Sequence, residues 1–153
     1  MGLSKKELEL RNQLVDLFKT QRFSVLATLE QTRPYVNLVA FAETEDLSAI
    51  FFATTRATRK YTNISAQSGV AMLVDNRSNE VADLSHAVAV TIIGTASELD
   101  EKDRALAEQK YLAKHPHMGE FLSSPTTALM KLEVETFYVV NRFQNVTVFN
   151  MKS

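Results

Sequence analysis

The sequence has no cysteine, and its 153 residues include only 4 glycines and 3 prolines. The absence of cysteine excludes disulfides, thiolate nucleophiles and zinc or iron-sulfur sites held by cysteine. With so few glycines, the glycine-rich phosphate loops and the glycine signatures of dinucleotide-binding and hydrolase folds are excluded as well. A chain without cysteine agrees with a reducing compartment, and we expect a cytoplasmic protein.

The chain also lacks an excess of charge of either sign, because 17 lysines and arginines face 18 acidic residues for a net charge of -1. Bulk electrostatics therefore gives no reason to expect nucleic acid or an anionic membrane surface as a partner, and any anion site must be local. The longest apolar run, 87–96, contains polar residues and a glycine and is too short to span a bilayer. We expect neither nucleic acid nor membrane as a partner.

What the chain does contain is sufficient for one domain covering 1–153, since 45% of its residues are hydrophobic and 23% are charged. Its first element is predicted to be a helix over about 5–20. Ser4 and Glu7 form a capping-box pattern there, and apolar residues follow at helical spacing.

After this helix, runs of strand-forming residues follow one another with short turns between most of them. The predicted strands are 23–29, 35–42, 49–54, 70–74, 87–99, 127–134, 137–143 and 146–151. Helices are predicted at 58–68, ended by Gly69, and at 100–114, with a short helical piece at 118–122 and a polar loop at 75–85. Short connections favour antiparallel pairing, so we predict a mainly β (α+β) fold, a small barrel with peripheral helices.

The strongest chemical signal is the segment 52–63, FATTRATRKYTN, where an apolar strand gives way to a helix. Hydroxyls and free backbone N–H groups can donate to phosphate oxygens there, and arginine and lysine can neutralise the charge. The alternative is that Thr58 only caps the helix and that the cations face water. From the spacing alone, both interpretations stay open.

The order of several short motifs resembles the pyridoxamine 5'-phosphate oxidase-like family of FMN-binding split barrels. The motifs are Leu26-Ala27-Thr28-Leu29, Arg33-Pro34-Tyr35-Val36-Asn37, Phe52-Ala53-Thr54-Thr55, Thr58-Arg59-Lys60 with Asn63-Ile64, and the strand 70–74. This resemblance implies a six-stranded antiparallel split β-barrel. It also implies a homodimer that binds FMN where the subunits meet and acts on a small molecule.

The resemblance assigns roles to individual residues of this chain. Arg59 and Lys60 match cations on the flavin phosphate, Thr58 matches a donor, and Thr54 and Thr55 match strand-end donors near the phosphate and the ribityl chain. Asn37 matches a position that reaches the edge of the isoalloxazine ring. The C-terminal arginine motif of pyridoxamine oxidases is missing, so vitamin B6 oxidation is not expected.

A second polar cluster, 75–79, follows the strand 70–74. The resemblance places this loop against the flavin of the partner subunit, where Asn76 and Arg77 are candidate cofactor-binding residues. The alternative is an ordinary turn with a solvated arginine.

The three histidines carry a weaker signal. His115 and His117 flank Pro116, but without a third ligand we expect surface residues rather than a metal site. The segment 111–116 also resembles haem-degrading relatives. We expect His86 to start a strand and to be structural, and we expect Phe137, Tyr138 and Phe143 to lie in the core or in a dimer interface.

The sequence therefore predicts an FMN-binding protein that acts as a flavin-dependent oxidoreductase. Because the flavin carries the redox chemistry, no catalytic side chain is nominated. A haem-binding or haem-degrading protein and a non-catalytic flavin-binding module stay as alternatives.

Overall fold

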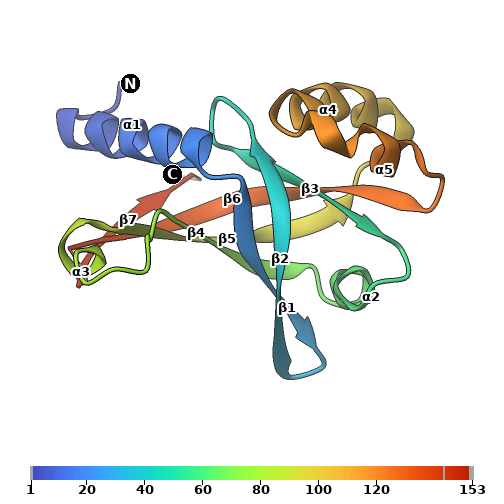
Figure 1. Ribbon diagram of the computed structural model, residues 1–153, viewed down its shortest axis with the longest axis horizontal. Coiled ribbons are helices and arrows are strands. Elements are labelled where there is room, and N and C mark those ends of the chain that lie inside the picture. Colours follow the sequence, from blue (N-terminus) through green and yellow to red (C-terminus); the bar gives the residue numbers. More distant parts are fainter. Residues whose placement is uncertain (1, 143, 152–153) are drawn as a thin grey trace.

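The computed structural model describes residues 2–142 and 144–151 and has seven strands in one antiparallel sheet. The strands are β1 (Phe23–Glu30), β2 (Arg33–Glu43), β3 (Ala49–Thr55), β4 (Gly69–Asp75), β5 (Val88–Glu98), β6 (Thr127–Asn141) and β7 (Asn145–Asn150). Their order is β3-β2-β1-β4-β5-β6-β7, and β3 also pairs with β6. The first six strands thus close into the predicted six-stranded antiparallel barrel, and β7 lies outside it (Figure 1).

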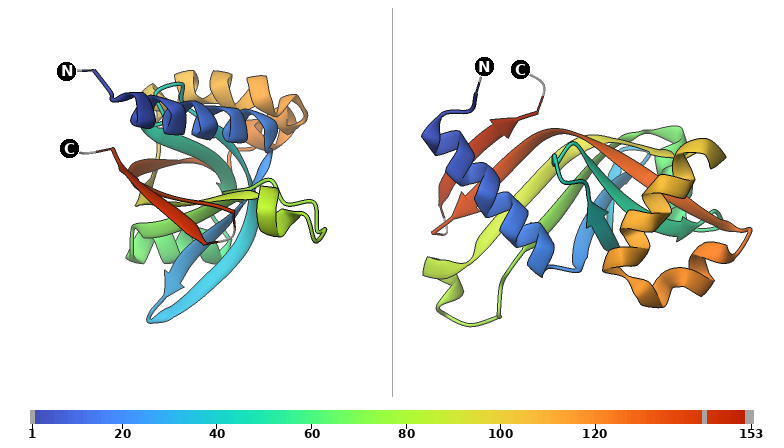
Figure 2. Two further views of the ribbon diagram at one scale, coloured as in Figure 1. Left: turned by 90° about the vertical axis from the view of Figure 1, so that its left-hand side faces the viewer. Right: turned by 90° about the horizontal axis from the view of Figure 1, so that it is seen from above.

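The helices lie around the barrel. They are α1 (Lys5–Thr20), α2 (Arg59–Ala66), α3 (Asp83–His86), α4 (Glu101–Lys114) and α5 (Gly119–Ser123), with a 3₁₀ turn, η1 (Pro116–Met118), between α4 and α5. Helices α1 and α4 lie on the same side of the barrel, while α2 lies near the opposite side (Figures 1 and 2). Among the described residues, no helix is long and apolar enough to cross a membrane.

Helix α1 begins at the predicted capping box. Ser4 Oγ accepts a hydrogen bond from the Glu7 backbone N–H at 3.2 Å, and a Glu7 carboxylate oxygen accepts one from the Ser4 N–H at 2.8 Å. The buried face of the helix carries Leu14 and Phe18, both fully buried, which join the main core. Phe18 packs edge-on against Phe41 of β2, with ring centroids 6.0 Å apart. The helix thus covers the inner face of the sheet with its apolar stripe.

The barrel is split between β2 and β3. Only three residue pairs join these strands, Phe41 with Phe52 and the next two pairs toward the hairpin turn. Beyond Phe41, residues 33–40 of β2 pair with β1 instead, while β3 continues to pair with β6 as far as Thr55. The two strands therefore diverge toward the end of β3 from which α2 follows.

The predicted strands 127–134 and 137–143 are one strand, β6, so this boundary was predicted wrongly. The polar residues around Glu135 resemble a turn in sequence, but the register against β5 shifts between Ile93 and Gly94 and leaves Glu135 as a bulge. A Cβ on Gly94 would lie 2.1 Å from the Glu133 carbonyl oxygen, so glycine permits this close approach. The second predicted strand ended at Phe143, which lies outside the described residues.

Two local predictions around β4 were also wrong. Gly69 is the first residue of β4 and does not cap α2, because the helix already ends at Ala66 and the extended backbone of Gln67 leads into the strand. The polar loop 75–85 includes the first residues of α3. The Asp83 carboxylate organises this loop by accepting backbone N–H groups of Ser78 and of the two residues that follow it.

The outer face of the sheet is largely apolar from β2 to β7. One continuous row of cross-strand neighbours follows the registers, and its members are Leu38, Val25, Leu73, Thr91, Tyr138 and Val148. Leu38 is 69% exposed, and its neighbour Val36 is also exposed. Phe137 lies in the core, which is one of its two predicted locations, and Tyr138 lies on this outer face, where its place in a dimer interface stays a prediction. An apolar face of this kind is typical of a surface that a partner covers.

Candidate cofactor site

Five of the predicted site residues come together where β3 leads into α2. We call this set the α2 corner; its members are Thr54, Thr55, Thr58, Arg59 and Lys60. Thr58 is the N-cap of α2, and its hydroxyl accepts a hydrogen bond from the Tyr61 backbone N–H at 3.3 Å. The Thr54 and Thr58 hydroxyls lie 2.7 Å apart, and the Thr58 hydroxyl also donates to the Thr55 carbonyl at 3.0 Å. The corner is therefore held by its own threonines.

Helix α2 is fixed to the barrel by a buried polar contact. The Asn63 side-chain amide donates to the Thr28 hydroxyl of β1 at 3.0 Å, and both side chains are buried. The first turn of α2, which carries Arg59 and Lys60, is thereby held beside the β1–β2 hairpin. Backbone N–H groups of a first helical turn have no intrahelical acceptor, and the helix dipole favours an anion there.

Arg59 contacts the hairpin rather than its own helix. Its Nη1 lies 2.8 Å from a carboxylate oxygen of Glu30, and its guanidinium carbon lies 5.7 Å from the centre of the Tyr35 ring. The hydrogen bond to Glu30 raises the pKa of Arg59. Sequence reasoning missed Glu30 and Tyr35, since both pair with Arg59 across the fold and no local spacing indicates it.

Lys60 differs from Arg59 in having no acidic partner among the described residues. It is half-buried, and among the described residues no carboxylate lies within 4.0 Å of its ammonium group. Partial burial lowers the pKa of Lys60, because the charged form loses water without gaining an acidic partner. An anion bound at the start of α2 would supply that partner.

Arg56, the third cation of the segment, points to another part of the surface. It donates to both carboxylate oxygens of Glu98, at 3.2 and 2.6 Å, and to the Pro125 carbonyl at 2.9 Å. The Tyr61 hydroxyl also donates to Glu98, at 2.6 Å. The hydrogen bond from Arg56 is the main reason that the pKa of Glu98 is lowered. Arg56 is thus already matched with an anion, which leaves Arg59 and Lys60 as the cations of the corner.

Asn37 lies on the part of β2 that has separated from β3. It pairs with Leu26 and shares a strand face with Tyr35, which contacts Arg59. Its side-chain oxygen is buried and has no hydrogen-bond partner. A buried acceptor without a partner costs about 1–3 kcal/mol, so such atoms are few in folded proteins. Ser24 Oγ and Thr127 Oγ1 are also buried without a partner, but Asn37 alone of the three is a predicted site residue.

The other two predicted site residues, Asn76 and Arg77, lie just beyond the opposite end of β4 from α2 (Figure 1). Asn76 accepts a hydrogen bond from the Val88 N–H at 2.7 Å, and Arg77 forms an ion pair with Asp75 at 3.0 Å. Within one chain they do not join the α2 corner. Their assignment to the cofactor of a partner subunit stays a prediction.

Two of the three histidines, His86 and His115, are placed differently from the prediction. His115 is only 8% exposed, and its Nε2 lies 2.7 Å from the Phe41 carbonyl oxygen, because the end of α4 packs on β2. Burial lowers the pKa of His115. His117 is exposed as expected, and His86 ends α3 instead of starting a strand. Within residues 2–142 and 144–151, no group of three or more histidine, aspartate or glutamate side chains could hold a metal ion.

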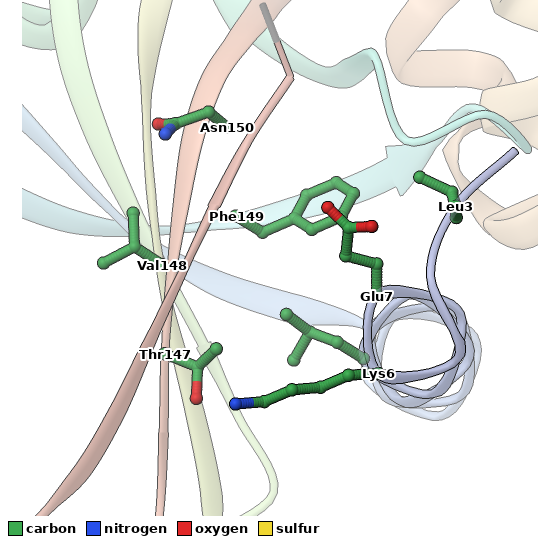
Figure 3. Close-up of a pocket in the computed structure, with 8 residues that line it drawn as sticks. Leu3, Lys6, Glu7, Thr147, Val148, Phe149 and Asn150 are labelled. Carbon is green, nitrogen blue, oxygen red and sulfur yellow. The ribbon is translucent and has the colours of Figure 1, made fainter. Parts of the chain in front are cut away.

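A cavity of about 370 Å³ lies between α1 and β7 and is lined by Lys6, Glu7 and Phe149, among others (Figure 3). None of the predicted site residues lines this cavity. It lies at the end of the molecule that carries both described termini, away from α2 (Figure 1). It therefore belongs to a different region from the α2 corner.

The fold is an antiparallel split barrel, and the α2 corner places two cations, Arg59 and Lys60, in the first turn of a helix. The pyridoxamine 5'-phosphate oxidase family model matches residues 10–141, and the chain belongs to that family. No curated protein matches the chain.

Solved structures share the fold at low sequence identity. A protein of unknown function from Agrobacterium tumefaciens has a TM-score of 0.78 and 21% identity, covering 95% of this chain and 64% of that one. A heme binding protein from Mycobacterium smegmatis has a TM-score of 0.80 and 15% identity over 98% and 60% of the two chains. An FAD-binding protein from Mesorhizobium loti has a TM-score of 0.67 and 15% identity over 84% and 90%. The chain thus spans less than two thirds of the first two.

Proposed function

We propose that this chain is a single-domain, cytoplasmic FMN-binding protein that acts as a homodimeric flavin-dependent oxidoreductase on a small molecule. The observation that carries the proposal is the α2 corner. It combines a helix start, threonine hydroxyls and two cations, of which Lys60 has no carboxylate within 4.0 Å among the described residues. Membership of the family and the flavin named for one structural neighbour also support it.

The residues present fit a flavin phosphate. Arg59 and Lys60 would neutralise the phosphate, and the backbone N–H groups of the first turn of α2, which Thr58 caps, would donate to its oxygens. Thr54 and Thr55 end β3, and their hydroxyls would lie near the ribityl chain. Asn37, whose buried oxygen has no partner, lies on the diverging part of β2 and would receive a donor from the ring edge.

When bound, FMN would supply the electron transfer, and the protein would bind and orient it and control access to its ring. No side chain of the α2 corner needs to act as an acid, base or nucleophile for this chemistry. The substrate would bind against the flavin in the cleft between subunits.

The homodimer is supported by the apolar outer face of the sheet. The row from Leu38 on β2 to Val148 on β7 crosses six strands, and both ends are at least half exposed. A second copy on this face would remove apolar surface from water. It would also allow Asn76 and Arg77 of the partner subunit to approach the α2 corner, which they do not reach within one chain.

The test is FMN affinity in variants of the two cations. Each of Arg59→Gln and Lys60→Gln is expected to weaken FMN binding about 10- to 100-fold, since each removes a charge-assisted hydrogen bond worth about 1.5–3 kcal/mol. Quenching of flavin fluorescence during titration of the apoprotein measures this. Lys110→Gln, an exposed lysine on α4, is the matched control and should bind FMN as the unmodified chain does. Full FMN affinity in the Arg59→Gln, Lys60→Gln double variant would contradict the assignment.

Haem binding is the second candidate, favoured by the likeness to a heme binding protein. His115 is a poor ligand for it, because its ring is buried and its Nε2 contacts the Phe41 carbonyl. The exposed His86 is the available alternative. A Soret band that forms on adding haem and is lost in His86→Ala would support this candidate. A protein that binds FMN but shows no turnover with any electron donor would instead be a non-catalytic flavin-binding module.

A further inference from the structure

The two cations of the α2 corner differ in what already surrounds them. Lys60 has no carboxylate within 4.0 Å among the described residues, whereas Arg59 is held by Glu30 at 2.8 Å. Glu30 is the last residue of β1, and its carboxylate lies on the same side of the hairpin as the first turn of α2. Both cations are expected to bind the ligand's anion, but Arg59 is already paired with the Glu30 carboxylate.

The backbone on both sides of Glu30 is held in place by contacts that do not involve Arg59. In the β1–β2 turn, the Gln31 carbonyl accepts a hydrogen bond from the Gln67 side chain at 2.8 Å. Two residues before Glu30, the Thr28 hydroxyl accepts the buried bond from Asn63 at 3.0 Å. These two bonds attach the hairpin to α2 and to its C-cap residue, Gln67, on both sides of Glu30. The backbone of Glu30 is consequently held near Arg59 independently of the ion pair.

We propose that Glu30 lowers the affinity of the cofactor site for phosphate ligands, because its carboxylate competes with the ligand's phosphate for Arg59. This inference rests on the proposed function. Arginine binds carboxylate and phosphate through the same N–H groups, so an incoming anion must share or displace Glu30. A phosphate monoester can do so, since it carries up to two negative charges and can also engage Lys60. A ligand with a weaker anion gains less, and an uncharged ligand does not compete at all.

The expected size of the effect follows from the exposure of the pair. The Arg59 and Glu30 side chains are 57% and 49% exposed, so solvent screens their attraction. Removing the charge of Glu30 is therefore expected to tighten FMN binding by about two- to fivefold. Affinity for riboflavin, which lacks the phosphate, should not change.

The experiment is a double-variant cycle with FMN and riboflavin as probes. FMN affinity is measured for the unmodified chain, Glu30→Gln, Arg59→Gln and the combination of the two substitutions. Glu30→Gln should bind FMN about two- to fivefold more tightly. The combined variant should bind FMN as weakly as Arg59→Gln alone, because the competitor acts through Arg59. Glu9→Gln, an exposed glutamate on α1, makes the same change in net charge and should leave affinity unchanged.

Three outcomes would overturn the role of Glu30 while leaving the proposed function intact. They are unchanged or weaker FMN binding in Glu30→Gln, a gain that persists without Arg59, and an equal gain in Glu9→Gln or for riboflavin. The last two would show a general effect of net charge or of the hairpin. If the unmodified chain binds no FMN, the proposed function fails, and the role of Glu30 fails with it.

Discussion

Two regions of this molecule place a lysine at the end of a helix against the barrel, and only one of them leaves polar groups without partners. At the start of α2 lie Lys60 and, nearby on β2, Asn37 with its unpartnered buried oxygen. At the end of α4 lies a polar cluster that we call the α4 junction; its members are Tyr111, Lys114, His115 and Glu43. The two regions face different parts of β2.

Every member of the α4 junction has a partner. Lys114 Nζ donates to the Phe18 carbonyl at 2.7 Å and to Glu43 at 2.8 Å, and it lies 3.8 Å from the centre of the Phe41 ring. The Tyr111 hydroxyl donates to the Ala40 carbonyl at 3.3 Å. A buried polar network of this kind stabilises one arrangement when all of its members are satisfied.

The comparison teaches that burial of a cation does not by itself indicate a binding site. Burial lowers the pKa of both lysines, and Lys114, only 16% exposed, is a fully paired structural residue. What distinguishes the α2 corner is the missing acidic partner of Lys60 among the described residues, together with the unpaired oxygen of Asn37. A ligand can add hydrogen bonds or ion pairs only where polar groups of the protein still lack partners.

The largest effect is expected from breaking the α4 junction. Lys114→Met leaves Glu43, 14% exposed, without its cation, and should lower the free energy of unfolding by about 3 kcal/mol. FMN affinity of the folded variant should not change, because the junction lies outside the α2 corner. Urea unfolding and FMN titration measure the two quantities.

Two further variants make that prediction specific. Lys110→Met removes an exposed lysine from the same helix and should change stability by less than about 0.5 kcal/mol. Combining Lys114→Met with Glu43→Gln should recover part of the loss, since no unpaired charge is then buried. A loss in Lys114→Met no larger than in Lys110→Met would show that the junction is not a stabilising network.

A smaller effect should appear as a pH dependence at the same junction. Burial holds the pKa of His115 below its usual value of 6.5. Below that pH the unfolded chain takes up a proton that the folded chain resists, so the unfolded state binds more protons and stability falls as the pH falls. The limit for one such group is about 1.4 kcal/mol per pH unit. Urea unfolding at about pH 7.5 and pH 5.5 should show a smaller difference for His115→Gln than for the unmodified chain. An equal difference in both would exclude His115 as the cause.

The parts of the molecule that could be predicted from sequence are those whose determinants are close together in the chain. Ser4 and Glu7 lie within one helical turn, and the members of the α2 corner lie within seven consecutive residues, 54–60. A strand end followed by an N-cap threonine fixes the positions of those residues locally. Strand formers and turns alternate in the same local way, and this was sufficient for the antiparallel barrel.

The parts that could not be predicted depend on contacts between distant segments. In sequence, Arg59 is 29 residues from its carboxylate partner and Arg56 is 42 residues from its own. His115 is 74 residues from the carbonyl that its ring contacts. No spacing rule identifies such partners, because they are set by how α2 and α4 pack on the barrel. The separation of Asn37 from β3 is similarly a property of the closed sheet, since the strand pattern of β2 continues without interruption.

The smallest effect is expected from a substitution of Asn37, whose unpaired oxygen is one of the two features that distinguish the start of α2 from the α4 junction. Asn37→Val removes a buried acceptor without a partner, so the free energy of unfolding without ligand should rise by about 1 kcal/mol. FMN affinity should fall about fivefold, because the flavin loses one neutral hydrogen bond. Ser24→Ala is the matched control, since Ser24 Oγ is also buried without a partner but lies on β1 opposite Val39, where both side chains are buried. It should gain stability and keep its FMN affinity. If Asn37→Val behaves like Ser24→Ala in both measurements, the unpaired oxygen of Asn37 is not part of a flavin site, and the contrast with the α4 junction then rests on Lys60 alone.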